Sequence, residues 1–143
     1  AMAKNFQTLI RMRKWALDEK RRELGDLQRV LDALQGEKAA LEQAVLAEQK
    51  VASENPELAG FAYGHFANAV IAEREILSKR IADQEVQIDA FLDEVADAFK
   101  ELKTAEIAER NRVDAERAEE DRKEQAELDE IGARQATRDD GLM

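Results

Sequence analysis

The sequence predicts an all-α protein: two long helices that fold back on each other as an antiparallel coiled-coil hairpin, the second helix longer and overhanging. Composition is the first reason, because 38% of the 143 residues are charged and only seven are aromatic, which is typical of long helices and coiled coils. Heptad spacing of apolar residues is the second. The third is a single short interruption that holds the chain's only proline, Pro56, which should end a helix at Asn55.

The first helix is predicted over about residues 6–52, where apolar residues recur every seven positions. From Leu24 to Val45, six of the seven seam positions are apolar, and Lys38 is the exception. A stripe of this kind requires a partner helix, because an exposed apolar seam is unfavourable in water. The two interleaved sets of seam positions are Ile10, Leu17, Leu24, Leu31, Lys38, Val45 and Ala52, and Phe6, Arg13, Lys20, Leu27, Leu34, Leu41 and Glu48.

We expect a turn over residues 53–63, a second helix over about 64–134 and a frayed tail over 135–143, all within a single domain. Arg74 and Gln84 are polar breaks in the second seam, and Ile76, Leu92 and Phe99 are expected to widen its apolar stripe. The seam positions are Ala67, Val70, Arg74, Leu77, Ile81, Gln84, Ile88, Phe91, Val95, Ala98, Leu102 and Ala105.

A turn centred near residues 56–60 also predicts a register, in which residue n faces approximately residue 115 minus n. Leu24 then faces Phe91, and Ile10 faces Ala105. The second helix continues roughly 25 residues beyond the start of the first, an overhang of roughly 40 Å at the helical rise per residue. Its own fold does not stabilise such a helix, so we expect it to insert into, or lie along, another protein.

Charge distribution limits the classes of partner. The net charge of −10 argues against nucleic-acid binding, which needs clustered cations. The charge is uneven: residues 4–22 contain seven basic and two acidic side chains, a local +5, whereas residues 106–140 contain thirteen acidic and seven basic, a local −6. A basic start and an acidic end favour two surfaces for different partners.

Catalysis is not expected. His65 is the only histidine and there is no cysteine, so a triad or a zinc site has too few side chains. No glycine-rich phosphate loop is present, and the carboxylates fall on solvated helix faces. We therefore predict no catalytic, metal or cofactor site. No apolar run reaches the roughly 18 residues of a membrane span, and no signal-peptide core precedes the first helix, so we expect a cytoplasmic protein.

The first turns contain one group of candidate partner-binding residues: Arg11, Arg13, Lys14 and Trp15. The apolar residues of these turns lie on more than one face of the helix, which favours a second face that is buried against a partner. Two alternatives stay open. The cations could form a solvated face matched to acidic residues such as Glu101 and Glu109, or the basic amphipathic turns could lie on a membrane.

Two further groups lie elsewhere along the chain. The rings of Phe61, Tyr63 and Phe66 either cap the tip of the hairpin or form a recognition patch, because aromatic residues anchor interfaces. Leu128 and Ile131 have no partner in the predicted register, and we interpret them as a docking element rather than as frayed helix.

Four stretches together resemble the FliJ family, the small soluble coiled-coil component of the bacterial flagellar type III export apparatus. They are residues 9–14 (LIRMRK), 18–22 (DEKRR), the tip at 56–63 (PELAGFAY) and the late stretch from 109 to 131, which ends KEQAELDEI. The resemblance implies a two-helix coiled coil similar to the central shaft of rotary ATPases. It implies binding to the export ATPase ring through the end that bears both termini, contact with the cytoplasmic part of the export gate, and recycling of export chaperones. It also implies that the protein is not an enzyme and reaches the inner membrane only through its partners.

Two alternatives remain at this stage. One is a self-associating structural scaffold or stalk, which the oligomeric state in solution would distinguish from a hairpin that is monomeric or weakly dimeric. The other is a coiled-coil finger that delivers Glu54 and Glu57 to a polymerase channel, although such proteins carry a second globular domain and none is apparent in these residues. The heptad pattern also does not decide whether the hairpin closes within one chain or between two.

Overall fold

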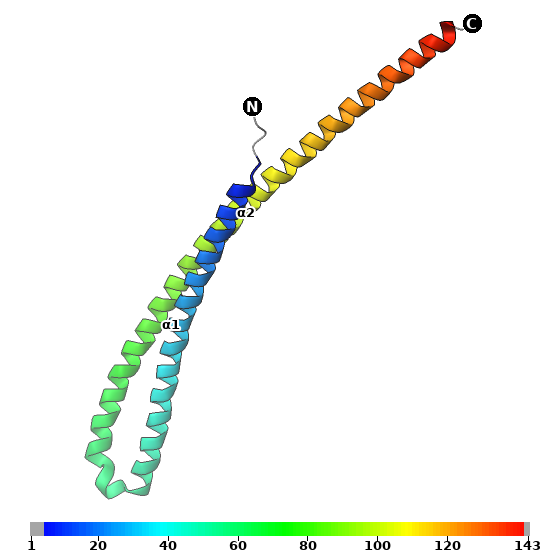
Figure 1. The fold of residues 1–143 in the computed structure, drawn as a ribbon. Coiled ribbons are helices and arrows are strands. Elements are labelled where there is room, and N and C mark those ends of the chain that lie inside the picture. Colours follow the sequence, from blue (N-terminus) through cyan, green and yellow to red (C-terminus); the bar gives the residue numbers. More distant parts are fainter. Residues whose placement is uncertain (1–4, 142–143) are drawn as a thin grey trace. The chain divides into compact units, whose positions relative to one another are not determined.

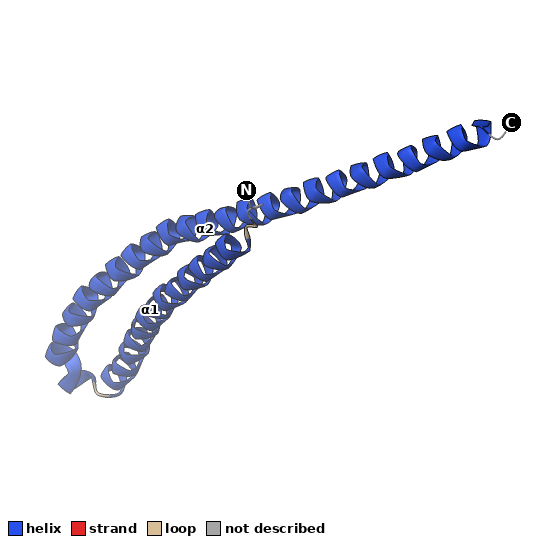
Figure 2. Cartoon of the chain, turned by 45° about the horizontal axis from the view of Figure 1, so that its top comes forward, coloured by secondary structure: helices blue, strands red, loops and turns tan. Residues whose placement is uncertain are grey.

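The computed structural model describes residues 5–141, apart from the side chains of Leu58, Ala59 and Phe61. Over these residues the chain forms two helices, α1 (Gln7–Glu54) and α2 (Pro56–Gly141), and no strand (Figure 1). Figure 2 shows that loop backbone is confined to the start of α1 and to the link between the helices. The prediction of an all-α antiparallel hairpin is confirmed, and the hairpin closes within one chain.

The break between the helices is much shorter than the expected turn over residues 53–63. Only Asn55 is non-helical, and α2 already begins at Pro56. Proline is favourable at the first helical position, where its missing N–H would have no partner anyway, and asparagine is favourable just before it. Glu57 in the first turn complements the positive end of the helix. The proline therefore starts the second helix as well as ending the first.

The second helix is longer than expected at both of its ends. Gly60 and Gly64 lie inside α2, and no described glycine has a positive φ. The helix also continues to Gly141, seven residues beyond the expected end at Arg134. An ion pair between Arg134 and Glu130, at 2.7 Å, and a hydrogen bond from the Thr137 hydroxyl to the Ala133 carbonyl support these last turns.

Backbone contacts divide the chain into two units. The first, residues 16–98, contains the middle and tip of the hairpin. Gln84 donates from Nε2 to the carbonyl oxygen of Leu27 at 2.9 Å, and Lys20 forms an ion pair with Glu94 at 3.3 Å. These contacts match the predicted register to within one helical turn. The residues buried in this unit are all predicted seam positions: Leu17, Leu34, Val70, Leu77, Gln84, Ile88 and Ala98.

The ribbons of α1 and α2 move apart toward the tip in both views of this unit (Figures 1 and 2). Polar seam positions occur in this half of the unit: Lys38 is half-buried and Arg74 is exposed. Tyr63 and Phe66 are half-buried in the first turns of α2 and continue the helical face of Val70 toward the tip.

The second unit contains residues 5–15 and 99–141. Here the start of α1 lies against α2, and Leu102 and Ala105 are buried. Arg13 forms an ion pair with Glu101 at 2.8 Å, and the backbone amide of Phe6 donates to Glu109 at 2.6 Å. Both contacts again match the predicted register. From residue 114 onward every described residue is exposed, so this part of α2 has no partner within the unit.

One expectation about the seam is wrong. Ile76, Leu92 and Phe99 do not widen the buried stripe, since they are 53%, 44% and 43% exposed. In a two-helix arrangement each helix buries only the narrow stripe that faces its single partner, so residues beside that stripe stay in contact with water. Within residues 5–141, neither helix contains a stretch apolar enough to cross a membrane.

Candidate partner-binding surfaces

The start of α1 is fixed to α2 by a small polar cluster. Glu109 accepts the Phe6 amide through Oε2 and two further hydrogen bonds from Arg112, of which the shorter is 2.6 Å. Arg112 also donates to Glu116 at 2.7 Å. The first amides of a helix have no partner within it, so Glu109 supplies a cap from the other helix. The Arg112 hydrogen bond, with that of the Phe6 amide, lowers the pKa of Glu109, and the same carboxylate raises the pKa of Arg112.

The four candidate residues of the first turns do not have the same environment. Arg13 is half-buried and paired with Glu101, as the interpretation of a charge-matched face expected. Arg11 and Lys14 are exposed and make no ion pair with any described residue, and Trp15 is 68% exposed. Met12, which is 62% exposed, lies beside them. The first turns therefore present a basic and apolar outer surface that the hairpin itself does not use.

A shallow groove adjoins this outer surface. It has a volume of about 320 Å³ and lies between the start of α1 and the facing turns of α2. Leu9, three residues before Met12 on the same helix, contributes to its wall. Its lining is mostly apolar, with Arg13 and Glu101 at its edge, so it can receive an apolar side chain of a partner. The lining residues are Phe6, Leu9, Arg13, Lys100, Glu101, Thr104, Ala105 and Ala108.

The late part of α2 has no partner within its unit, as the overhang argument predicted. Leu128 and Ile131 are 60% and 57% exposed. Local ion pairs support the surrounding helix: Arg122 binds Glu119 at 2.7 Å, and this contact lowers the pKa of Glu119 and raises that of Arg122. Such pairs add only a few tenths of a kcal/mol each to a helix. Residues 114–141 carry eleven acidic and five basic side chains, so this exposed helix has a net charge of −6.

The ring-rich candidates belong to the other unit, at the tip. Tyr63 and Phe66 are half-buried, which leaves part of each ring accessible, and His65 is exposed. The side chain of Phe61 lies outside the described residues. The tip candidates belong to the unit of residues 16–98, whereas the first-turn candidates belong to the unit of residues 5–15 and 99–141.

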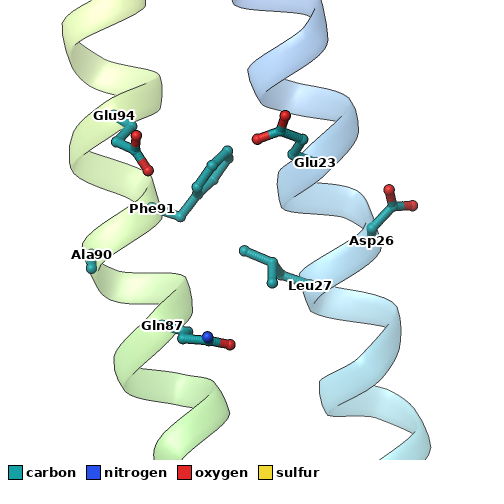
Figure 3. Close-up of a pocket in the computed structure, with 7 residues that line it drawn as sticks. All are labelled: Glu23, Asp26, Leu27, Gln87, Ala90, Phe91 and Glu94. Atoms are coloured by element: carbon teal, nitrogen blue, oxygen red, sulfur yellow. The ribbon is translucent and has the colours of Figure 1, made fainter.

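Sequence reasoning missed a second groove, in the middle unit. It has a volume of about 500 Å³ between α1 and α2, with Leu27 and Phe91 pointing toward each other across it and Glu23 at its side (Figure 3). Two of the three carboxylates that line the groove already form ion pairs. Glu94 binds Lys20, and the Lys20 ammonium group also lies 5.4 Å from the Phe91 ring centroid. Asp26 pairs with Arg29. The lining residues are Glu23, Asp26, Leu27, Gln87, Ala90, Phe91 and Glu94.

Over residues 5–141, no three histidine, aspartate or glutamate side chains are placed to hold a metal ion together. In a comparison with protein families, residues 2–141 match the family described as flagellar FliJ protein.

The chain belongs to the FliJ family. The match covers nearly the whole chain, including both helices and the exposed acidic end of α2. The protein is thus a flagellar export-related coiled-coil protein, and FliJ proteins are not a known enzyme family. No match was found among curated proteins or among solved structures.

Proposed function

We propose that this FliJ protein acts as a shaft-like coiled coil that engages the ring of the flagellar export ATPase. The observation that carries the proposal is the exposed helix over residues 114–141, which has no partner within its unit and has the length and polarity of an element that enters another protein. The helical rise gives these residues a length of about 42 Å. Family membership supports the export apparatus as the setting.

The unit that contains both chain ends is the part that we propose to meet the ring. Arg11, Lys14 and Trp15 are exposed on α1, and their side chains make no ion pair or hydrogen bond with any described residue. Leu128 and Ile131 are exposed on the acidic end of α2. Arg13 serves the hairpin instead, through its ion pair with Glu101. Two surfaces of opposite charge in one unit suit a ring that contacts the protein at more than one level.

The tip in the middle unit is the part that we propose to contact other members of the apparatus. Tyr63 and Phe66 offer partly accessible rings, and aromatic side chains are frequent anchors at interfaces. The partners that we infer are the cytoplasmic part of the export gate and, in a second role, export chaperones. The protein would then be cytoplasmic and reach the inner membrane only through these partners.

ATP hydrolysis by the export ATPase of the same organism tests the proposal. The full chain is added at low salt, and hydrolysis and ring assembly are followed together. We expect faster hydrolysis and more assembled ring, and we expect both effects to decrease for Trp15→Ala. Val86→Ala is the matched control, since Val86 is as exposed as Trp15, at 68%, but lies in the middle unit. No stimulation by the wild-type chain would contradict the proposal.

A self-associating scaffold is the competing function. Light scattering on the same sample separates the two, because a scaffold without ATPase stimulation would form large and open-ended assemblies.

A further inference from the structure

Two exposed surface patches of the unit of residues 5–15 and 99–141, called the terminal unit from here on, carry opposite charges, and each also contains exposed apolar side chains. The basic patch comprises Arg11, Met12, Lys14 and Trp15 on α1. Its residues are linked by separations of three and four positions (11 to 14 and 15, and 12 to 15), so they are neighbours on one helix surface. Its two cations make no ion pair with any described residue.

The acidic patch comprises Glu124, Glu127, Leu128 and Ile131 on α2. The same separations of three and four positions connect its members, so two carboxylates and two apolar side chains share one surface. Neither Glu124 nor Glu127 pairs with a cation among the described residues, whereas the adjacent Glu130 binds Arg134. Each patch thus combines two unmatched charges of one sign with two exposed apolar side chains.

The two patches of one chain cannot meet. Arg13 and Glu101 place the basic patch near residue 100 of α2. The acidic patch lies about 35–45 Å further along the same helix at the standard rise, and α2 is unbroken from Pro56 to Gly141. A helix cannot fold back on itself without a break, so whatever covers the patches belongs to another molecule.

We propose that the occupant is a second copy of this chain. Two copies related by a two-fold axis near Asp114, with their α2 helices antiparallel, bring each basic patch against the acidic patch of the other copy. Such an interface is self-complementary and closes at two copies. The apolar groove beside Met12 lies next to the place where Leu128 and Ile131 of the second copy arrive. This inference goes beyond the proposed function and does not depend on it.

The contact is small, with four side chains from each patch, so the dimer is weak and sensitive to salt. Because it covers the same surfaces that we propose for the ATPase ring, dimer formation and ring binding exclude each other. A chain without its ring partner then has its exposed apolar residues covered.

Sedimentation equilibrium of the full chain at low and high salt tests the proposal. We expect a monomer–dimer equilibrium that shifts toward monomer as salt is added. Trp15→Ala is expected to weaken the dimer about tenfold or more, since the residue occurs twice in the interface. A wild-type chain that is monomeric at every salt concentration and at the highest concentration attainable would overturn the proposal.

Charge reversal gives the sharper experiment. One variant carries Arg11→Glu and Lys14→Glu, and the other carries Glu124→Lys and Glu127→Lys. Each alone is expected to dimerise about a hundredfold less tightly than wild type, because like charges meet in both halves of its interface. Mixed together they should form a heterodimer, since one half regains opposite charges and the other half keeps its original ones.

The control variant carries Lys79→Glu and Arg80→Glu, two exposed positions of the middle unit. It changes the net charge as much as the first variant and should dimerise as wild type does. A mixture of the two reversed variants that stays monomeric would also overturn the proposal. If those variants nevertheless lose ATPase stimulation, the patches serve the ring alone.

Discussion

The most direct test of how the two helices pack is the substitution Leu77→Ala. Leu77 is only 2% exposed and is the largest fully buried side chain among the described residues. The hydrogen bond from Gln84 to the Leu27 carbonyl places these two residues at the same level of the hairpin. Because the helices are antiparallel, the residue seven positions after Leu27, which is Leu34, lies level with the residue seven positions before Gln84, which is Leu77. Leu34 is 4% exposed. This leucine layer is therefore a main apolar contact of the middle unit.

The expected cost follows from what is removed. Leucine has three more carbon groups than alanine, and at about 0.8 kcal/mol for each buried group their transfer is worth about 2.4 kcal/mol. A cavity adds to this cost when the surroundings cannot close around it. A seam between two helices has water on both sides and relaxes more easily than a globular core. We therefore expect the free energy of unfolding to fall by about 3 kcal/mol, near the low end for buried leucines.

Urea unfolding followed by far-ultraviolet circular dichroism measures the change. Ile76→Ala is the matched control, because Ile76 is the preceding residue and is 53% exposed. Half of its side chain is already in water, and alanine is the better helix former, so we expect a loss of only about 0.5 kcal/mol. If Leu77→Ala cost no more than Ile76→Ala, the register and the burial assigned to this layer would be refuted.

Three further changes test other features of the hairpin. Gln84→Leu should raise the free energy of unfolding by about 1 kcal/mol in the urea assay, because apolar burial at this 9%-exposed seam position outweighs the loss of one hydrogen bond; a loss of stability would show that the bond to Leu27 matters more. Gly36→Ala should add about 0.5–1 kcal/mol, since an added Cβ meets nothing within 4 Å and the backbone is helical; a destabilised variant would contradict that open environment. The pKa of Glu109 is lowered in the folded chain, so its contribution is present above the usual glutamate pKa and is lost as the pH falls through the folded value. Hydrogen exchange at the Phe6 amide should therefore accelerate as the pH falls below the usual glutamate pKa, relative to amides of the middle unit, and Glu109→Ala should show fast exchange already at neutral pH; a pH-independent ratio in the wild type would exclude this cap.

Much of the fold could be predicted because its signals are periodic and local. Eleven of the twelve predicted seam positions of α2 are buried or half-buried, and Arg74 is the exception. Contacts such as Arg13 with Glu101 and Lys20 with Glu94 follow the register expected from a single central break. The length of the non-helical break was overestimated, because Asn55-Pro56-Glu57 was interpreted only as the end of a helix. The same residues are also favourable for starting a helix.

The candidate surfaces were predictable only in part. Their residue types were evident in the sequence, but their individual environments were not. Arg11, Arg13 and Lys14 look alike in sequence, yet only Arg13 lies close enough to a carboxylate of α2 to be paired. The groove between Leu27 and Phe91 was not foreseen, because it depends on how closely the side chains of two different helices pack rather than on the pattern within either helix.

The sequence by itself determined that this chain forms two long helices, that they pair in an antiparallel hairpin, and that the second extends beyond the first. Heptad spacing and a lone proline are sufficient for this, because one stripe of apolar residues needs one partner helix. The tertiary structure decided which side chains remain available to other molecules. That choice depends on contacts between residues far apart in the chain, such as the capping of the Phe6 amide by Glu109, 103 positions away. The periodic pattern places residue 109 opposite Phe6, but it does not say that the Glu109 carboxylate binds the Phe6 amide. That hydrogen bond depends on the distance between the two helices rather than on the pattern within either.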